Sequence, residues 1–153
     1  MNAGSRRTSP RAAWSRIALA ATLGLLAVTA SLAEETKKMI VTRSGTQPAA
    51  PGPADYFTGT VRVQSLFPVA DPSRVSAVSV TFEPGARSAW HVHPAGQTLV
   101  VTSGTGWIQE EGGQKQVIRA GDIIWTPPDV KHWHGATATE GITHVAIQES
   151  VNG

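Results

Sequence analysis

The sequence predicts an all-β domain of short antiparallel strands, arranged as a sandwich or a barrel. From residue 55 onward the chain alternates between strand-length runs, many with β-branched or aromatic residues at every second position, and clusters of Gly, Pro or Asp. No long stretch keeps the apolar spacing of a helix. About eight short strands in roughly 95 residues are typical of a small antiparallel sandwich or barrel.

The expected strands follow one another with little chain between them. In order they lie at 58–67, 74–83, 97–103, 106–111, 115–121, 122–127, 131–137 and 142–150. Ser103-Gly104 and Glu111-Gly112-Gly113 have the composition of hairpin turns, so a turn is expected at each.

Alternation along two of these strands predicts an apolar wall. Val78, Val80 and Phe82 share one face of the strand at 74–83, and Leu99 and Val101 share one face of the strand at 97–103. Tryptophans are expected to pack in the core or at an interface rather than to take part in chemistry. They are Trp90, Trp107, Trp125 and Trp133.

Residues 1–33 are typical of a signal peptide, which predicts a periplasmic or secreted protein. Basic residues come first, the uncharged run IALAATLGLLAVTA occupies 17–30, and Ser31-Leu32-Ala33 places small residues at a cleavage site. The apolar run is short for a bilayer-spanning helix, so no stable membrane insertion is expected after cleavage, although an uncleaved anchor is the alternative. Residues 34–54 are expected to be a flexible linker or arm, and 55–150 the folded domain.

The charge distribution argues against a nucleic-acid partner. The chain has 13 Lys and Arg and 11 Asp and Glu, but four Arg lie in 1–33, which leaves 13 − 4 = 9 basic and 11 acidic residues in the remainder. No basic stripe is left for phosphate contacts. The absence of cysteine excludes disulfides, thiolate metal sites and cysteine nucleophiles.

Four of the five histidines form two close pairs. His91-Val92-His93 and His132-Trp133-His134 each place two imidazoles at i and i+2, which on a strand puts both on the same face. Two such strands can direct their histidines to one point inside a barrel. The pattern favours a metal site over a set of solvated or structural histidines, and imidazole suits Zn, Mn, Fe, Ni and Cu alike.

The residues around these pairs have fixed spacing. Gly85, His91, His93, Gln97 and Gly104 read G-x5-H-x-H-x3-Q-x6-G, and Gly121, Pro127, Asp129 and His132 read G-x5-P-x-D-x2-H. This spacing resembles the two sequence motifs of the cupin superfamily, which implies a single small antiparallel β-barrel of jelly-roll type with a metal in its mouth. Gln97 stands where the family usually has a glutamate, and Asp129 stands where it usually has a glycine.

Residues 55–149 also resemble the small bacterial manganese-dependent cupin hydroxynitrile lyases. The resemblance implies one divalent ion, with Mn²⁺ expected and Fe²⁺, Zn²⁺ or Ni²⁺ as alternatives. The implied ligands are His91, His93, Gln97 and His132. The implied catalytic groups are His134, His144 and Gln148.

Gln97 has a direct consequence for the chemistry of such an ion. A neutral amide in place of a carboxylate leaves the ion with a higher net charge, which makes it a stronger Lewis acid and harder to oxidise. Unlike glutamate, glutamine cannot accept a proton. Both effects favour binding of an anionic oxygen or a small anion over oxygenase chemistry.

The remaining histidines and Gln148 have two interpretations each. His134 suits proton transfer because its ordinary pKa is near neutral, and the alternative is a histidine that only orients a ligand. His144 and Gln148 lie at i and i+4 on one strand face, where they are either groups of a pocket wall or structural residues.

The sequence therefore predicts an exported, metal-dependent cupin enzyme with hydroxynitrile lyase-like chemistry on a small hydroxy or carbonyl substrate. The alternatives are a metal-dependent dioxygenase and a ligand-binding protein without catalysis. The unpaired edges of an open sandwich also favour a homo-oligomer, a dimer or a tetramer.

Overall fold

The computed structural model describes residues 38–152 of the protein. The expected signal peptide at 1–33 and the first part of the arm lie outside the described residues. Within 38–152 the chain contains no helix with the length and apolarity needed to cross a membrane. Residues 40–152 belong to one compact unit, which carries every strand of the described residues.

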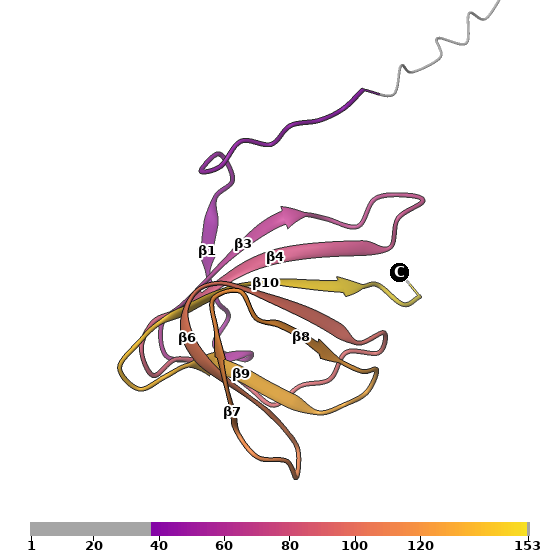
Figure 1. The fold of residues 1–153 in the computed structure, drawn as a ribbon. Coiled ribbons are helices and arrows are strands. Elements are labelled where there is room, and N and C mark those ends of the chain that lie inside the picture. The colour runs from indigo at the N-terminus through magenta and orange to yellow at the C-terminus, as the bar shows by residue number, and fades with distance from the viewer. Residues whose placement is uncertain (1–37, 153) are drawn as a thin grey trace, which may run out of the picture. The chain divides into compact units, whose positions relative to one another are not determined.

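Ten strands make up this unit (Figure 1). They are β1 (Ala49–Pro51), β2 (Phe57–Thr58), β3 (Val61–Phe67), β4 (Val75–Phe82), β5 (Arg87–Ser88), β6 (Gln97–Glu110), β7 (Gln116–Arg119), β8 (Ile123–Thr126), β9 (His132–Ala136) and β10 (Ile142–Glu149).

The strands form one curled sheet in the order β1-β3-β4-β10-β6-β9-β5-β2, with β7 and β8 also paired to β6. Every pairing is antiparallel. The long strand β6 links the two halves, because its first half pairs with β10 and β8 and its second half with β9 and β7. The predicted all-β, antiparallel, barrel-like fold is confirmed.

One predicted turn is wrong. Ser103-Gly104 does not close a hairpin, because β6 runs through it without interruption. Gly104 has a positive φ of 77°, and the register between β6 and β10 shifts nearby, between Thr143 and His144. The register shift leaves Thr102 without a partner on β10, so β6 has a bulge close to the glycine and continues without a turn. The turn at 111–113 is present, between β6 and β7.

Three short strands were not predicted as separate strands. They are β1, β2 and β5, and each has only two or three residues. β1 pairs with β3 through Ala49↔Gln64, so the last part of the segment 34–54 joins the sheet.

The core lies between the two halves of the curled sheet. Its fully buried side chains include Phe82 on β4, Leu99 and Val101 on β6, and Ile142 on β10. Phe82 packs edge-on against Phe57 at a ring-centroid distance of 5.8 Å. This apolar layer supports the histidine cluster.

Candidate metal centre

Backbone hydrogen bonds join the two histidine-bearing segments. The amide of His91 donates to the carbonyl of His132, and the amide of His132 donates to the carbonyl of His91, both at 2.9 Å. The amide of Asp129 also donates to the carbonyl of His93 at 3.0 Å. Asp129 has a φ of 61°, a left-handed conformation that aspartate tolerates better than most residues. These backbone hydrogen bonds hold the two segments side by side without the help of a metal ion.

Three histidines converge at this junction. One ring nitrogen from each of His91, His93 and His132 lies within 4.8 Å of the others. The Nδ1 atoms of His91 and His132 lie 2.8 and 2.9 Å from the carbonyls of Ala89 and Val130. A carbonyl only accepts, so each Nδ1 carries the proton and each Nε2 keeps a lone pair.

Gln97 completes the group from the start of β6. Its Oε1 lies 3.3 Å from Nε2 of His132, and its Nε2 donates to Oε1 of Gln148 at 3.4 Å. The contact with Gln148 directs the amide oxygen of Gln97 toward His132. Nε2 of His132 and Oε1 of Gln97 then face each other as two acceptors, which is an arrangement that a cation would stabilise.

These residues fit a divalent ion. Nε2 of His93 is buried and has no hydrogen-bond partner among the described residues, so its lone pair is available to bind a metal ion. Three neutral imidazoles and one amide oxygen are ligands that a borderline divalent metal accepts. The three histidines can therefore hold a metal ion, and Gln97 is placed to join them.

His134 and His144 form a second, deeper pair. Nδ1 of His134 lies 3.1 Å from Nε2 of His144, and both side chains are buried. His144 is fully enclosed behind His134, where its other neighbours include Phe82. The amide of His134 donates to Oγ of the buried Ser88, which fixes β9 at this point.

Burial lowers the pKa of all five histidines, so each is neutral near pH 7. The pKa of His93 falls to about 4 because of burial and then the nearby His91 and His132. Burial likewise lowers the pKa of His144 to about 4. His134 has its pKa held well below the ordinary value by burial and by His144. The pKa values of His91 and His132 are also lowered, mainly by burial.

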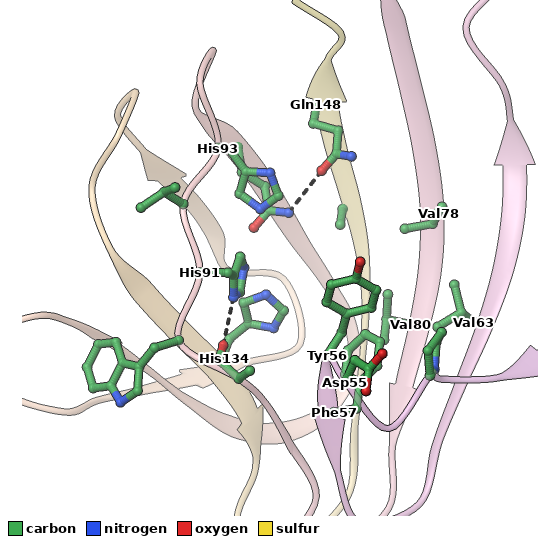
Figure 2. A pocket seen from close by; sticks show the side chains of 16 residues that line it. Asp55, Tyr56, Phe57, Val63, Val78, Val80, His91, His93, His134 and Gln148 are labelled. Atoms are coloured by element: carbon green, nitrogen blue, oxygen red, sulfur yellow. Dashed lines mark hydrogen bonds between the residues drawn. The ribbon is translucent and has the colours of Figure 1, made fainter.

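A cavity of about 560 Å³ opens onto the histidines. Figure 2 shows His91, His93 and Gln148 on one side of it and Val63, Val78 and Val80 on the other. His134 and Gln97 also line the cavity, whereas His144 and His132 do not. The expected apolar wall is thus formed by Val78 and Val80, while Phe82, Leu99 and Val101 are core residues.

Comparison with known proteins decides the family. Residues 78–147 match the model of the cupin domain. An (R)-mandelonitrile lyase from Granulicella tundricola is 56% identical over 115 residues, which cover 75% of this chain and 88% of that protein. The chain belongs to the cupin family. A crystal structure of a cupin-like protein from Thermotoga maritima is 43% identical, with a TM-score of 0.62 over 67% of this chain and 77% of that one.

More distant cupins share the fold alone. A cupin-2 domain from Rhodospirillum rubrum has a TM-score of 0.62 at 16% identity, and the alignment covers 76% of this chain and 78% of that chain. The barrel is therefore retained across large changes in sequence.

The sequence did not indicate several residues of this cupin's cavity. Asp55, Tyr56 and Phe57 line it from the segment around β2, and Trp90 lines it from the segment before His91. Their position depends on the pairing of β2 with β5. Each of these strands has only two residues, which is too short for a pattern of alternating apolar and polar residues. The only signal was the aromatic pair Tyr56-Phe57 within an otherwise polar, Pro-rich stretch.

The buried His144 predicts that the metal-free cupin loses stability in acid. Its folded pKa of about 4 lies below the value of about 6.5 expected in the unfolded chain. As pH falls below 6.5 the unfolded chain binds a proton that the folded chain does not, so the free energy of unfolding decreases between about pH 6.5 and 4 and is retained above that range. Through this difference in pKa, His144 accounts for a decrease in the free energy of unfolding on the order of 3 kcal/mol. His144 faces His134 on β9, while Val80 and Val101 flank it on β4 and β6.

Urea unfolding of metal-free protein at pH 7.5 and 4.5 measures this loss. A His144→Gln variant should lose distinctly less stability between the two pH values, since one of the five histidines with a lowered pKa is gone. Equal losses in the two proteins would show that His144 does not contribute.

Proposed function

We propose that this cupin is a metal-dependent hydroxynitrile lyase that cleaves a cyanohydrin into an aldehyde and hydrogen cyanide. The observation that carries the proposal is the 56% identity to an (R)-mandelonitrile lyase across most of both chains. It is supported by the cluster of His91, His93 and His132, which lies beside a cavity that a small cyanohydrin can enter.

His134 is the group to which we assign the proton transfer. Its Nδ1 faces His144, which leaves Nε2 for a substrate in the cavity that His134 lines. When His134 donates from Nδ1 to His144, its Nε2 carries a lone pair and can act as a base. His144 is enclosed, so it acts on the substrate only by holding His134 in this orientation.

All the bonds that form and break in this cleavage belong to the substrate and to His134. The hydroxyl proton passes to Nε2 of His134, the oxygen electrons form the carbonyl double bond, and the C–C bond breaks with its electron pair leaving on cyanide. His134 returns the proton to cyanide, so the products are an aldehyde and hydrogen cyanide.

His91, His93, Gln97 and His132 would hold the metal ion, and we propose that this ion is manganese. When bound, it would supply positive charge that stabilises negative charge developing on the substrate. Because Gln97 is neutral, it leaves that charge undiminished. Gln148 keeps the amide oxygen of Gln97 turned toward His132 and also lines the cavity, where it can donate to a bound polar group.

Away from the metal site, the wall of the cavity favours an uncharged part of the substrate. Asp55 is the charged group in its lining, and among the described residues no Lys or Arg lines it. A carboxylate substrate would find no cationic side chain to replace its hydration, whereas an apolar substituent can lie against Val63, Val78 and Val80.

Cyanide release tests the proposal directly. Mn²⁺-loaded protein should release cyanide from mandelonitrile faster than both buffer and chelator-stripped protein, at mildly acidic pH, where spontaneous decay is slow. Equal release from the loaded and stripped proteins would reject the lyase function. Oxygen uptake with a diketone in that case would indicate a dioxygenase instead.

We further propose that the protein is exported and forms homo-oligomers. Export rests on the basic, apolar and small-residue order of 1–33. The intact mass of protein from the extracytoplasmic fraction should correspond to a chain beginning at Glu34, and full-length protein confined to the cytosol would contradict export.

A further inference from the structure

The cavity has a chemically different outer end, to which Asp55 and Tyr56 contribute. Both residues line the cavity and both are exposed to solvent, Tyr56 by 65%. Figure 2 shows them on the side of Val63, across the cavity from His91 and His93. The histidines therefore lie at one end of the cavity, and a carboxylate lies where the cavity opens to solvent.

A short turn holds the backbone of Asp55 in this place. The amides of Tyr56 and Phe57 donate to the carbonyl of Pro53 at 3.0 and 3.1 Å. On the other side, the amide of Ala89 donates to the carbonyl of Tyr56 at 2.8 Å. Because these bonds fix the backbone on both sides of Asp55, the position of its carboxylate is set by the fold.

The fold itself makes no use of the Asp55 side chain. Aspartate in a turn commonly accepts a hydrogen bond from a nearby backbone amide, as Asp122 does from the amide of Arg119 at 2.7 Å. Within residues 38–152 the carboxylate of Asp55 makes no such bond, and it takes part in neither of the two ion pairs found there. The carboxylate is therefore free to contact a molecule in the cavity.

The chemistry of this carboxylate selects the group that it can bind. It accepts hydrogen bonds and repels anions, and a hydrogen bond to a charged acceptor is stronger than one between neutral groups. An ammonium group would lose much of its hydration beside the apolar wall, whereas a hydroxyl group loses less. A neutral hydroxyl donor is therefore the group that fits the outer end.

The size of the cavity leaves room for such a group. Its volume of about 560 Å³ lies within the range of sites for drug-sized ligands, so a cyanohydrin with an unsubstituted phenyl ring would not fill it. A substrate with its reacting hydroxyl at His134 can extend along Val63 and Val80 toward Asp55. The substituent farthest from the reacting carbon then reaches the outer end.

We infer that Asp55 selects aromatic cyanohydrins whose ring carries a hydroxyl group at the end distant from the reacting carbon. This inference rests on the proposed lyase function and names its substrate class. Asp55 accepts a hydrogen bond from the ring hydroxyl and contacts none of the reacting atoms, so it determines specificity without taking part in the cleavage.

Calorimetric binding of product aldehydes to the full Mn²⁺-loaded chain tests this inference. The two probes are para-hydroxybenzaldehyde and para-methylbenzaldehyde, which have similar size and differ in the ability to donate a hydrogen bond. At mildly acidic pH, where the phenol stays protonated, the wild type should bind the hydroxyl compound about 10-fold more tightly than the methyl compound.

Two variants assign this preference to Asp55. Asp55→Ala should bind both aldehydes about equally, and Asp55→Asn, which keeps a neutral acceptor of the same shape, should retain only part of the preference. The matched control is Glu140→Ala, which removes an exposed carboxylate outside the cavity and should keep the wild-type ratio. Because each result is a ratio of two affinities in one protein, a general change in the cavity cancels. Metal content reports on the integrity of the histidine cluster.

The outcomes separate this inference from the lyase proposal. Equal affinities of the wild type for the two aldehydes would overturn the inference, and so would a preference that Asp55→Ala leaves intact. Failure of both aldehydes to bind would overturn the inference and the lyase proposal together. Equal cyanide release from metal-loaded and stripped protein would reject the lyase proposal alone, because the binding ratios do not depend on catalysis.

Discussion

Replacing His134 with alanine is expected to leave the metal in place and to slow cyanide release from mandelonitrile by about 10²–10⁴-fold. His134 lines the cavity but is not among the three histidines that converge. Its removal therefore takes away the proton acceptor without removing a ligand. The decrease should appear mainly in kcat, because the apolar wall that binds the substrate is unchanged.

Two measurements separate proton transfer from a structural role of His134. Metal content by elemental analysis should equal that of the wild type, and added imidazole should restore part of the lost rate by entering the space left by the side chain. A parallel loss of metal and activity would mean that His134 supports the metal site instead. An unchanged rate would exclude it as the proton acceptor.

The sequence was sufficient to predict the fold and the convergence of the histidines. The i, i+2 spacing in His91-Val92-His93 requires only a locally extended chain to place both rings on one side. The sequence could not show that His91 and His132 exchange backbone hydrogen bonds, because that contact joins segments about forty residues apart. It is this long-range bridge that turns two local patterns into one cluster.

The roles of His144 and Gln148 could not be separated by sequence, since both lie on one face of β10. The structure separates them by depth. His144 pairs with Val80 and Val101 within the core layer, whereas Gln148 lies four residues further along β10, closer to the mouth, and contacts Gln97. Depth inside a curled sheet depends on the curvature of the sheet. Part of that curvature comes from the register shift at Thr102, beside the Ser103-Gly104 pair whose composition predicted a turn.

A variant with both His91→Ala and His93→Ala is expected to lose stoichiometric metal while it keeps its β-sheet circular dichroism. Two of the three converging ring nitrogens are removed, including Nε2 of His93, which has no hydrogen-bond partner within residues 38–152. His132 and Gln97 then remain as too small a ligand set. The core residues Phe82, Leu99 and Ile142 are not touched, so the fold should persist.

Thermal unfolding with and without a chelator provides the decisive measurement. A metal that binds the folded chain raises its melting temperature, so chelation should lower the midpoint of the wild type and leave a cooperative transition. In the double variant the same chelator should change nothing. A matched control, Gln148→Ala, removes a cavity-lining group that is not a proposed ligand and should retain most of its metal. Full metal occupancy in the double variant would place the ion elsewhere and remove the basis for the lyase mechanism, because the cavity would then open onto histidines with no ion between them.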